Sequence, residues 1–238
     1  MRRATVLLMT VAMAALPPIA GCAQQPEARD YSQYLAHMPR SILVLPPLNE
    51  STQVHAPDAF LSTITVPLAE RGYYVFPVAV VDQFMKDNGL PTPGEMHQVP
   101  AHKFGEVLGA DAVLYITIKN WTTTYIVIDS STVVGLNYRL VDARSGVEMW
   151  KDERSFTFST SAGQSDPLAA LVAAAVHAAI NPNSANERRL AAAANFQIIH
   201  DPNNGMLVAT HHPKFNEEQQ RVKEKQQSRA ELASAKPR

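Results

Sequence analysis

The sequence predicts a mixed α/β domain, in which early strand–helix–strand units lead into an antiparallel meander and then into Ala-rich helices, an α+β order of elements. Two observations support this fold class. Before residue 110, short apolar runs alternate with stretches of helical spacing, and Pro or Gly separates them. From residue 110 the apolar period changes to two, which is typical of strands. With 238 residues, 46% of them hydrophobic, the chain can build such a domain.

The first half should supply a buried strand and several short helices. Residues 41–45 are apolar and are closed by Pro46 and Pro47, which indicates a buried strand. Apolar residues at four-residue spacing over 58–71 indicate an amphipathic helix, which Pro67 kinks or restarts. The other elements expected here are a polar loop at 49–57, a strand at 73–76, a helix at 79–88, a loop at 90–100 and a helix at 102–108.

The middle of the chain should form an antiparallel meander, because strand-like segments follow one another with short turns between them. The expected strands are 112–119, 122–128, 134–141 and 147–158, with turns at 129–131 and 142–146. We expect this sheet to include the early strands as well. Its predicted buried residues are Leu43, Leu45, Val75 and Leu114.

The last third should be helical and then polar. Ala-rich stretches at 167–180 and 185–196 predict two helices that can pack closely, and residues 201–205 predict a turn. The final 25 residues, 214–238, carry seven basic and four acidic side chains and many glutamines. Such a composition predicts a frayed helix or a disordered tail.

The N-terminus resembles a bacterial lipoprotein signal. Arg2 and Arg3 precede an apolar run over 4–16, which has the length of a signal-peptide core and is too short to span a bilayer. Small residues then lead to Gly21 and Cys22, the one cysteine of the chain, as in a lipobox. The resemblance implies cleavage after Gly21 and acylation of Cys22, and the absence of aspartate directly after the cysteine resembles an outer-membrane address.

These signals divide the chain into four regions. They are a signal peptide at 1–21, a lipidated tether at 22–38, an α/β domain at 39–213 and a charged tail at 214–238. The alternative for the first region is an ordinary secretory signal with an incidental cysteine.

Composition and motifs argue against several function classes. The formal net charge of −1 does not favour a nucleic-acid protein that neutralises phosphates. No nucleophile elbow, phosphate-binding loop, zinc-protease motif or dinucleotide fingerprint is present. The paired histidines His211 and His212 would point to opposite faces of a strand, so they do not suit one metal ion. We therefore expect no catalytic residue, no metal site and no cofactor.

Two groups of residues are candidates for an interaction surface. Pro46, Pro47 and Asn49 follow a strand end, where ligands often bind in α/β domains. Trp121 and Tyr125 would share a face near another strand end and would suit a protein or glycan surface. The alternatives are a plain turn for the first group and packing in the core or on the sheet for the second.

Four segments together resemble an uncharacterised family of Gram-negative lipoproteins, whose best-known member is a neisserial surface lipoprotein of unknown function. These segments are RSILVLPPLNES at 40–51, PLAERGYYVFPVAVVDQF at 67–84, GADAVLYITIKNW at 109–121 and YRLVDARSGVEMW at 138–150. The resemblance covers residues 39–213, and it extends in fold to the N-terminal domain of TolB and to the curli secretion lipoprotein CsgG. It implies an envelope location and assembly into oligomers, and it supplies no catalytic residue.

Three functions follow from these observations. The first is a non-enzymatic lipoprotein of the outer membrane, facing the periplasm, that serves assembly or secretion with protein partners such as a CsgG-like lipoprotein. The second is a module that binds peptidoglycan or another envelope glycan, and the third is an envelope hydrolase. We also expect a homodimer, because the outer strands of the sheet need cover. The alternative is that residues 206–213 return as an edge strand and seal the sheet.

Overall fold

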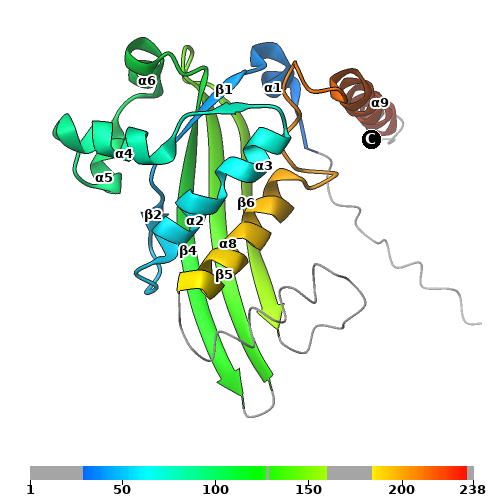
Figure 1. Cartoon of the computed structure of the whole chain (residues 1–238). Coiled ribbons are helices and arrows are strands. Elements are labelled where there is room, and N and C mark those ends of the chain that lie inside the picture. Colours follow the sequence, from blue (N-terminus) through cyan, green and yellow to red (C-terminus); the bar gives the residue numbers. More distant parts are fainter. Residues whose placement is uncertain (1–28, 127–128, 160–183, 235–238) are drawn as a thin grey trace, which may run out of the picture.

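A computed structural model describes residues 29–126, 129–159 and 184–234. Its centre is a six-stranded mixed sheet in the order β3–β1–β4–β5–β6, with β2 paired to β4 beyond the end of β1 (Figure 1). The predicted mixed α/β class is confirmed. The predicted signal peptide, Gly21, Cys22 and the first Ala-rich helix lie outside the described residues.

The parallel half of the sheet is built from the early strands. β1 (Ser41–Val44) lies between β3 (Tyr74–Val75) and β4 (Ala112–Ile126) and runs parallel to both. β2 (Leu48–Asn49) is parallel to β4 as well. The Pro-Pro pair interrupts the early strand between β1 and β2, because proline has no N–H to give to a sheet ladder.

The antiparallel half consists of three long strands. β4 has 15 residues and pairs with β5 (Asp129–Asp142), which pairs with β6 (Glu148–Ser159). The predicted turn at 129–131 is wrong, because β5 already begins at Asp129 and the ladder continues to the Ile126–Asp129 pair. Cross-strand pairing here outweighs the turn preference of Asp-Ser-Ser. The β4–β5 ribbon therefore extends beyond the helices (Figure 1).

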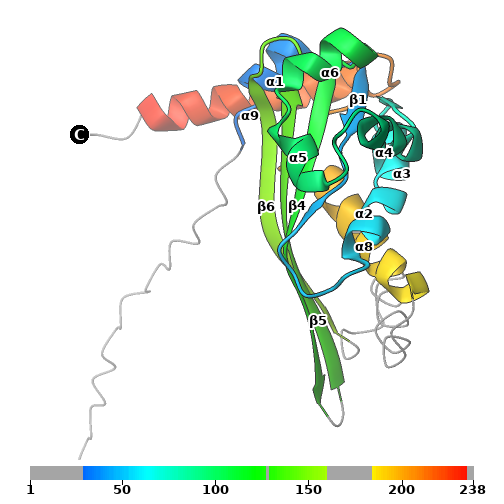
Figure 2. The same cartoon turned by 90° about the vertical axis from the view of Figure 1, so that its left-hand side faces the viewer.

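Helices cover both faces of the sheet (Figures 1 and 2). The first face packs against α1 (Ser32–His37), α2 (Ala56–Thr63), α3 (Thr65–Glu70) and α8 (Ser184–Ile199). The second face packs against α4 (Val78–Asp87), α5 (Pro93–Gln98) and α6 (Ala101–Leu108). A further helix, α9 (Phe215–Ser234), lies at the end of the molecule near α1.

The predicted core residues lie in this one sheet, on its two faces. Leu43 and Leu45 pack with the α4–α6 layer, whereas Leu114 and Val75 pack on the opposite face. Three of the four are fully buried, and Val75 is half-buried. Neighbouring residues of β1 point to opposite faces of the sheet, and helices cover both faces. The sequence of β1 is therefore a continuous apolar run.

Two helix predictions need correction. The loop expected at 90–100 contains α5, whose start is a capping box between Thr92 and Glu95 with Pro93 at the first helical position. The helix expected over 58–71 is divided at Ile64, three residues before Pro67. Pro67 is tolerated there because it lies in the first turn of α3, where its missing N–H has no helical partner to lose.

The predicted tether is shorter than expected, because residues 29–38 belong to the domain. α1 carries Tyr34 into the core, where it is fully buried and its hydroxyl contacts that of Tyr73. Tyr31 is also buried, and its hydroxyl donates to the Gly205 carbonyl oxygen. The polar composition of this segment gave no sign that its two tyrosines are buried. Their rings pack in the core, and their hydroxyls form hydrogen bonds there.

The C-terminal part of the domain also differs from a simple tail. The helical alternative for 214–238 is confirmed by α9, and Val222 of this helix is buried. Residues 206–209 are buried but do not form the sealing strand considered above, although the Ala209 N–H donates to the Arg71 carbonyl oxygen at 2.8 Å. Three described alanines of α8 face the core: Ala191, Ala193 and Ala194.

Candidate functional site

The residues predicted to form an interaction surface are mostly buried. Pro46 and Pro47 are both buried, and the Pro46 carbonyl oxygen accepts a hydrogen bond from His97 at 2.9 Å. Asn49 is exposed, but its side chain is engaged within its own loop, where Nδ2 donates to the Gln53 carbonyl oxygen at 2.9 Å. The proline surface prediction is therefore wrong, because α5 covers this strand end.

Trp121 is a core residue, which confirms the alternative that it packs in the core. Only 6% of its surface is exposed, and its ring meets Phe60 edge to face at 5.9 Å. The cause is a bulge between Ile118 and Asn120, which shifts the alternation of β4 by one residue. Tyr125 lies on β4 opposite Ser130, and its side chain is outside the described part.

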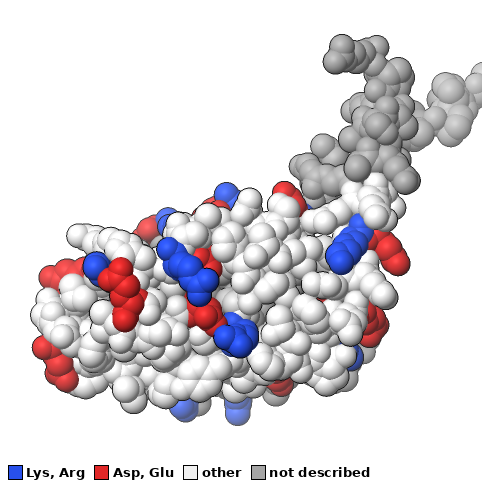
Figure 3. Space-filling model, turned by 90° about the horizontal axis from the view of Figure 1, so that it is seen from above, with Lys and Arg blue, Asp and Glu red and all other residues white. Residues whose placement is uncertain are grey.

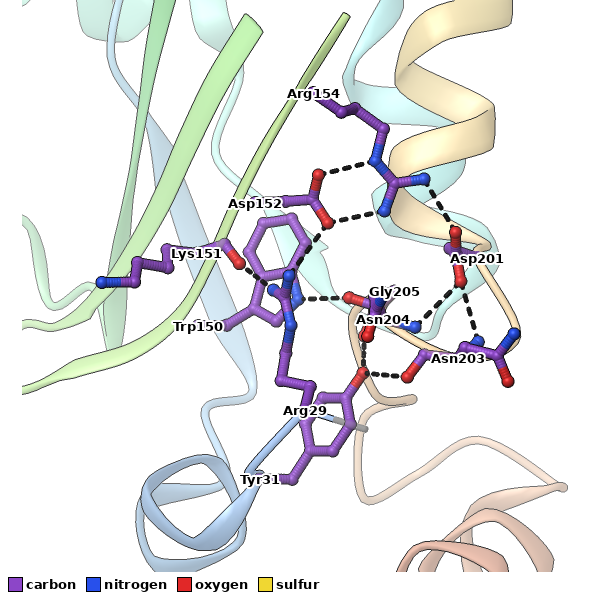
Figure 4. Close-up of polar contacts among 10 residues, drawn as sticks. All are labelled: Arg29, Tyr31, Trp150, Lys151, Asp152, Arg154, Asp201, Asn203, Asn204 and Gly205. Atoms are coloured by element: carbon purple, nitrogen blue, oxygen red, sulfur yellow. Dashed lines mark hydrogen bonds and ion pairs between the residues drawn. The ribbon is translucent and has the colours of Figure 1, made fainter. Parts of the chain in front are cut away.

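A polar cluster marks the place where the chain joins the folded domain (Figure 4). The guanidinium of Arg29 lies over the Trp150 ring, 5.3 Å from its centroid. It donates to the Lys151 carbonyl oxygen and, at 3.0 Å, to Asp152 Oδ2. Lys151 belongs to β6, so Arg29 occupies a backbone acceptor on an outer strand. This contact fastens the start of the domain to the sheet edge.

Asp152 is the buried centre of this cluster, with 3% of its surface exposed. Besides Arg29, it binds Arg154 through two hydrogen bonds of 2.7 Å. Arg154 also donates to Asp201 Oδ2 at 2.7 Å. These carboxylates raise the pKa of Arg154, with the hydrogen bond to Asp152 as the largest cause. Two cations and two carboxylates thus balance one another, as a buried charge requires.

The same cluster shapes the turn at 201–205. Asp201 Oδ1 accepts the N–H groups of Asn203 and Asn204, each at 2.8 Å. The Trp150 indole N–H donates to the Asn204 carbonyl oxygen at 2.8 Å. At Gly205 any side chain is excluded, because a Cβ would lie 2.5 Å from the Asp201 carbonyl oxygen. We call Arg29, Asp152, Arg154 and Asp201 the clamp.

The clamp adjoins the helix α9. Glu218 Oε2 accepts the Val208 N–H at 2.6 Å, and Glu218 Oε1 pairs with Arg71 at 3.0 Å. Both side chains of that ion pair are largely buried. Gln226 of the same helix donates to Asp30 at 3.4 Å. The first residues of the domain and its last helix therefore meet at one end of the molecule (Figure 2).

A second feature is a groove on the open part of the second sheet face, with a volume of about 440 Å³. Its floor includes Tyr115, Thr117, Asn137 and Arg139, and the α5–α6 link forms one wall. His97 at its rim meets the Tyr115 ring edge to face at 5.3 Å. Burial lowers the pKa of His97 and outweighs the opposing hydrogen bond to Pro46.

Surface charge, metal-ligating side chains and helix apolarity add three observations. On the face seen in Figure 3, acidic and basic side chains lie in mixed groups rather than in one extended patch. Among the residues that the structure describes, no three His, Cys, Asp or Glu side chains gather so that they could hold a metal ion. No helix in the described ranges combines the length and apolarity that a membrane span needs.

Known proteins resemble most of this chain. A family model described as "Putative lipoprotein GNA1162-like" matches residues 29–211, so the match begins at the clamp residue Arg29. A Neisseria meningitidis serogroup B protein named "Putative lipoprotein NMB1124/NMB1162" is 37% identical over 213 residues, which is 89% of this chain and 98% of that protein.

Solved structures give the same picture. The crystal structure of lipoprotein GNA1162 from Neisseria meningitidis has a TM-score of 0.51 and 41% identity, and covers 60% of this chain and 96% of that one. The LpoB C-terminal domain from Escherichia coli is more distant, with 16% identity, a TM-score of 0.35 and coverage of 50% of this chain and 84% of that one.

Proposed function

Because this chain belongs to the GNA1162-like lipoprotein family, we propose that it is a non-enzymatic interaction protein of the cell envelope, anchored through Cys22. In this proposal the anchor lies in the outer membrane, and the domain faces the periplasm. There it serves the assembly of an envelope or secretion complex with protein partners. The lone cysteine after a short apolar run supports the anchor, and alanine directly after it supports the outer-membrane address.

The observation that carries this proposal is the distance between Cys22 and the clamp. Only six residues lie between Cys22 and Arg29, and the seven Cα–Cα steps that join the two span at most about 25 Å when fully extended. Arg29 is held by Trp150, Lys151 and Asp152, so the residues from Arg29 onward add no length to the segment that joins Cys22 to the domain. An acylated Cys22 would therefore hold the clamp end close to the membrane surface.

The same geometry directs the long ribbon away from that surface. β4 has 15 residues, which corresponds to about 50 Å of strand. The β4–β5 end lies opposite the end that carries α1 and α9 (Figure 1). A lipoprotein held at the clamp would thus present this ribbon to partners in the periplasm, which suits an assembly role better than a role at the lipid surface.

The charged residues of the described domain support a non-enzymatic role. Asp152 and Asp201 are the two carboxylates of the clamp, and both are paired with Arg154. A general acid or base needs a free lone pair or proton that can reach substrate. The clamp instead uses these carboxylates to hold two ends of the chain together.

A partner could be a second copy of this chain or another lipoprotein, such as a CsgG-like one. The Ala-rich face of α8 is already buried, so a homodimer would use a sheet edge. Among the described strands β6 is the longer outer one, with 12 residues, whereas β3 has two. Arg29 covers one carbonyl oxygen of that edge, at Lys151.

The experiment combines lipid labelling with crosslinking in cells. A palmitate analogue should label the natural chain and not Cys22→Ala, and the variant should leave the membrane fraction. A photo-crosslinking residue at Thr122 or Thr124, both exposed on the ribbon, should give defined protein adducts that disappear in the Cys22→Ala background. Gln33, exposed on α1, is the matched control position. Equal adducts from the ribbon with and without Cys22 would contradict the anchored assembly role.

A further inference from the structure

Three side chains on the floor of the groove carry polar groups that form no hydrogen bond inside the described domain. Tyr115 lies opposite Arg139 across the β4–β5 ladder, and Thr117 lies opposite Asn137. Tyr115, Thr117 and Asn137 are half-buried. Within the described residues, the hydroxyls of Tyr115 and Thr117 and the amide of Asn137 form no hydrogen bond to protein. They are a row of neutral donors and acceptors facing the groove.

The wall beside this row is apolar. Val99 and Pro100, in the link between α5 and α6, line the groove together with Ala101 at the start of α6 and with Leu48 and Val141. A volume of about 440 Å³ lies within the range of sites for small molecules or short segments of a polymer. An apolar wall facing a row of hydrogen-bonding groups suits a ligand with one C–H face and one polar edge.

Beside the groove, two cations share one carboxylate. Arg139 pairs with Glu148 at 3.0 Å, and its guanidinium lies 5.6 Å from the centre of the Tyr115 ring. Glu148 also contacts Lys151 at 3.4 Å. His97 donates from Nε2 to the Pro46 carbonyl oxygen, which leaves its other ring nitrogen without a proton when the ring is neutral. The arginine that lines the groove, Arg139, therefore already has a carboxylate partner.

The backbone at the floor is already engaged. β4 and β5 pair along this stretch, so their N–H and C=O groups lie in the plane of the sheet and serve the ladder. A peptide that binds as an added strand needs a free sheet edge, which a sheet face does not offer. Side chains alone must recognise a ligand here, and the neutral ones on the floor are two hydroxyls and an amide, with the amide of Gln98 at the wall.

We propose that this groove binds a neutral saccharide chain, whose ring face packs on the Val99–Ala101 wall and whose hydroxyl or acetamido groups bond to Thr117 and Asn137. This site goes beyond the proposed assembly role and does not depend on the lipid anchor. Its ligand could be an amino-sugar polymer or a glycan without acetamido groups, which share the same hydroxyl chemistry.

The test uses the full mature chain, purified from membranes in detergent, in calorimetric titrations with chitotetraose and with cellotetraose. Asn137→Leu and Thr117→Val should each weaken saccharide binding, by about tenfold, because each removes a hydrogen bond to the ligand. Thr157→Val makes the same chemical change at an exposed position of β6 outside the groove, and should leave binding unchanged. Thermal unfolding should be nearly unaltered in Asn137→Leu and Thr117→Val, since neither residue loses a described protein partner.

Each outcome of the titrations either supports or overturns the proposed saccharide site. Saturable binding of either sugar that is lost in Asn137→Leu and Thr117→Val supports the site, and the preferred sugar shows whether the acetamido group is recognised. Absence of saturable binding overturns the proposal, as does binding that these two changes leave intact. Binding of an uncharged tetrapeptide in place of both sugars, with the same loss in the variants, would overturn the saccharide assignment.

Discussion

Asn195 shows how one buried polar residue joins three elements of this fold. It lies on α8 with none of its surface exposed, and its Oδ1 accepts the hydroxyl of Tyr138 from β5. Its Nδ2 donates to the Phe60 carbonyl oxygen at 3.2 Å and to the Thr63 hydroxyl at 2.9 Å, both on α2. Because these groups satisfy one another, the amide fixes the position of the two helices on the sheet.

Replacement of Tyr138 by Phe should lower the free energy of unfolding by about 1–3 kcal/mol, because Asn195 Oδ1 is then buried without its donor. Urea denaturation at neutral pH measures this loss. Tyr115→Phe is the matched control: its hydroxyl faces the groove, so the change should stay within about 0.5 kcal/mol. Similar losses in both variants would show that the Tyr138 hydroxyl contributes nothing specific.

For single residues, the sequence predicted burial correctly only where apolar and polar residues alternate regularly along a strand. Leu114 follows the period of two and is buried as expected. Trp121 reaches the core because of the bulge near Asn120, and nothing in the local composition specifies that bulge. Pro46 and Pro47 are buried because α5 lies over them, and that contact joins segments about 50 residues apart in the chain. Such positions depend on tertiary packing rather than on local preference.

The helix α9 packs on the domain although its sequence is typical of a solvent-exposed segment. Its composition is mostly polar, and only a few side chains hold it, chiefly Glu218 and Val222. Outside α9 the partners of Glu218 are Arg71 and the Val208 N–H, and within the helix it also pairs with Arg221. The distant partner Arg71 could not be inferred from a local pattern, so the sequence predicted a frayed helix or a disordered tail rather than a docked helix.

Substitution of Glu218 by Ala should release α9, because Arg71 loses its carboxylate and the Val208 N–H loses its acceptor. We expect a loss of about 2–4 kcal/mol in docking, in the range found when one member of a buried ion pair is removed. Hydrogen exchange of the amides in 216–226 measures it. Glu217→Ala, at an exposed neighbouring position, should keep these amides protected. Protection that persists in Glu218→Ala would contradict this attachment.

The turn at 201–205 should make the clamp sensitive to acid. Burial alone would raise the pKa of Asp201, but the Arg154 hydrogen bond and the Asn204 and Asn203 N–H groups outweigh it and hold that pKa below its usual range. A carboxylate with a lowered folded-state pKa stabilises the fold above its unfolded value, about 3.9, and this contribution is lost as pH falls through the folded pKa.

Unfolding free energies measured from pH 5 downward should therefore fall less steeply in Asp201→Asn than in the natural chain. The variant should already be less stable at pH 5, because Arg154 keeps only Asp152 as a charged partner. Parallel curves for the two proteins would show that Asp201 does not couple proton binding to folding.

For the whole molecule, the sequence predicted the order of elements better than their extent. The change of period near residue 110 indicated antiparallel strands, although the two expected at 112–119 and 122–128 are one strand, β4. Gly72 and Gly109 ended helices as expected. The length of the ribbon was missed, because Asp129, Ser130 and Ser131 favour turns locally but are held in the ladder by β4. The fold also begins earlier than composition suggested, since Tyr31 and Tyr34 are buried.

The central claim is that a short segment after Cys22 and the clamp at Arg29 hold one end of the domain at the membrane and direct the β4–β5 ribbon away from it. Cys22 is the one cysteine of the chain, and acylation would block its thiol, so a newly introduced cysteine can be labelled alone. Exposed positions are available at both ends, at Gln33 on α1 and at Thr122 on the ribbon.

The most direct measurement is the quenching of a fluorophore at each position by spin-labelled lipid headgroups, with the lipidated chain in nanodiscs. Gln33→Cys should be quenched and Thr122→Cys should not, because the ribbon end lies tens of ångströms from the clamp along a strand of about 50 Å. Quenching at Thr122→Cys equal to or stronger than at Gln33→Cys would contradict the account.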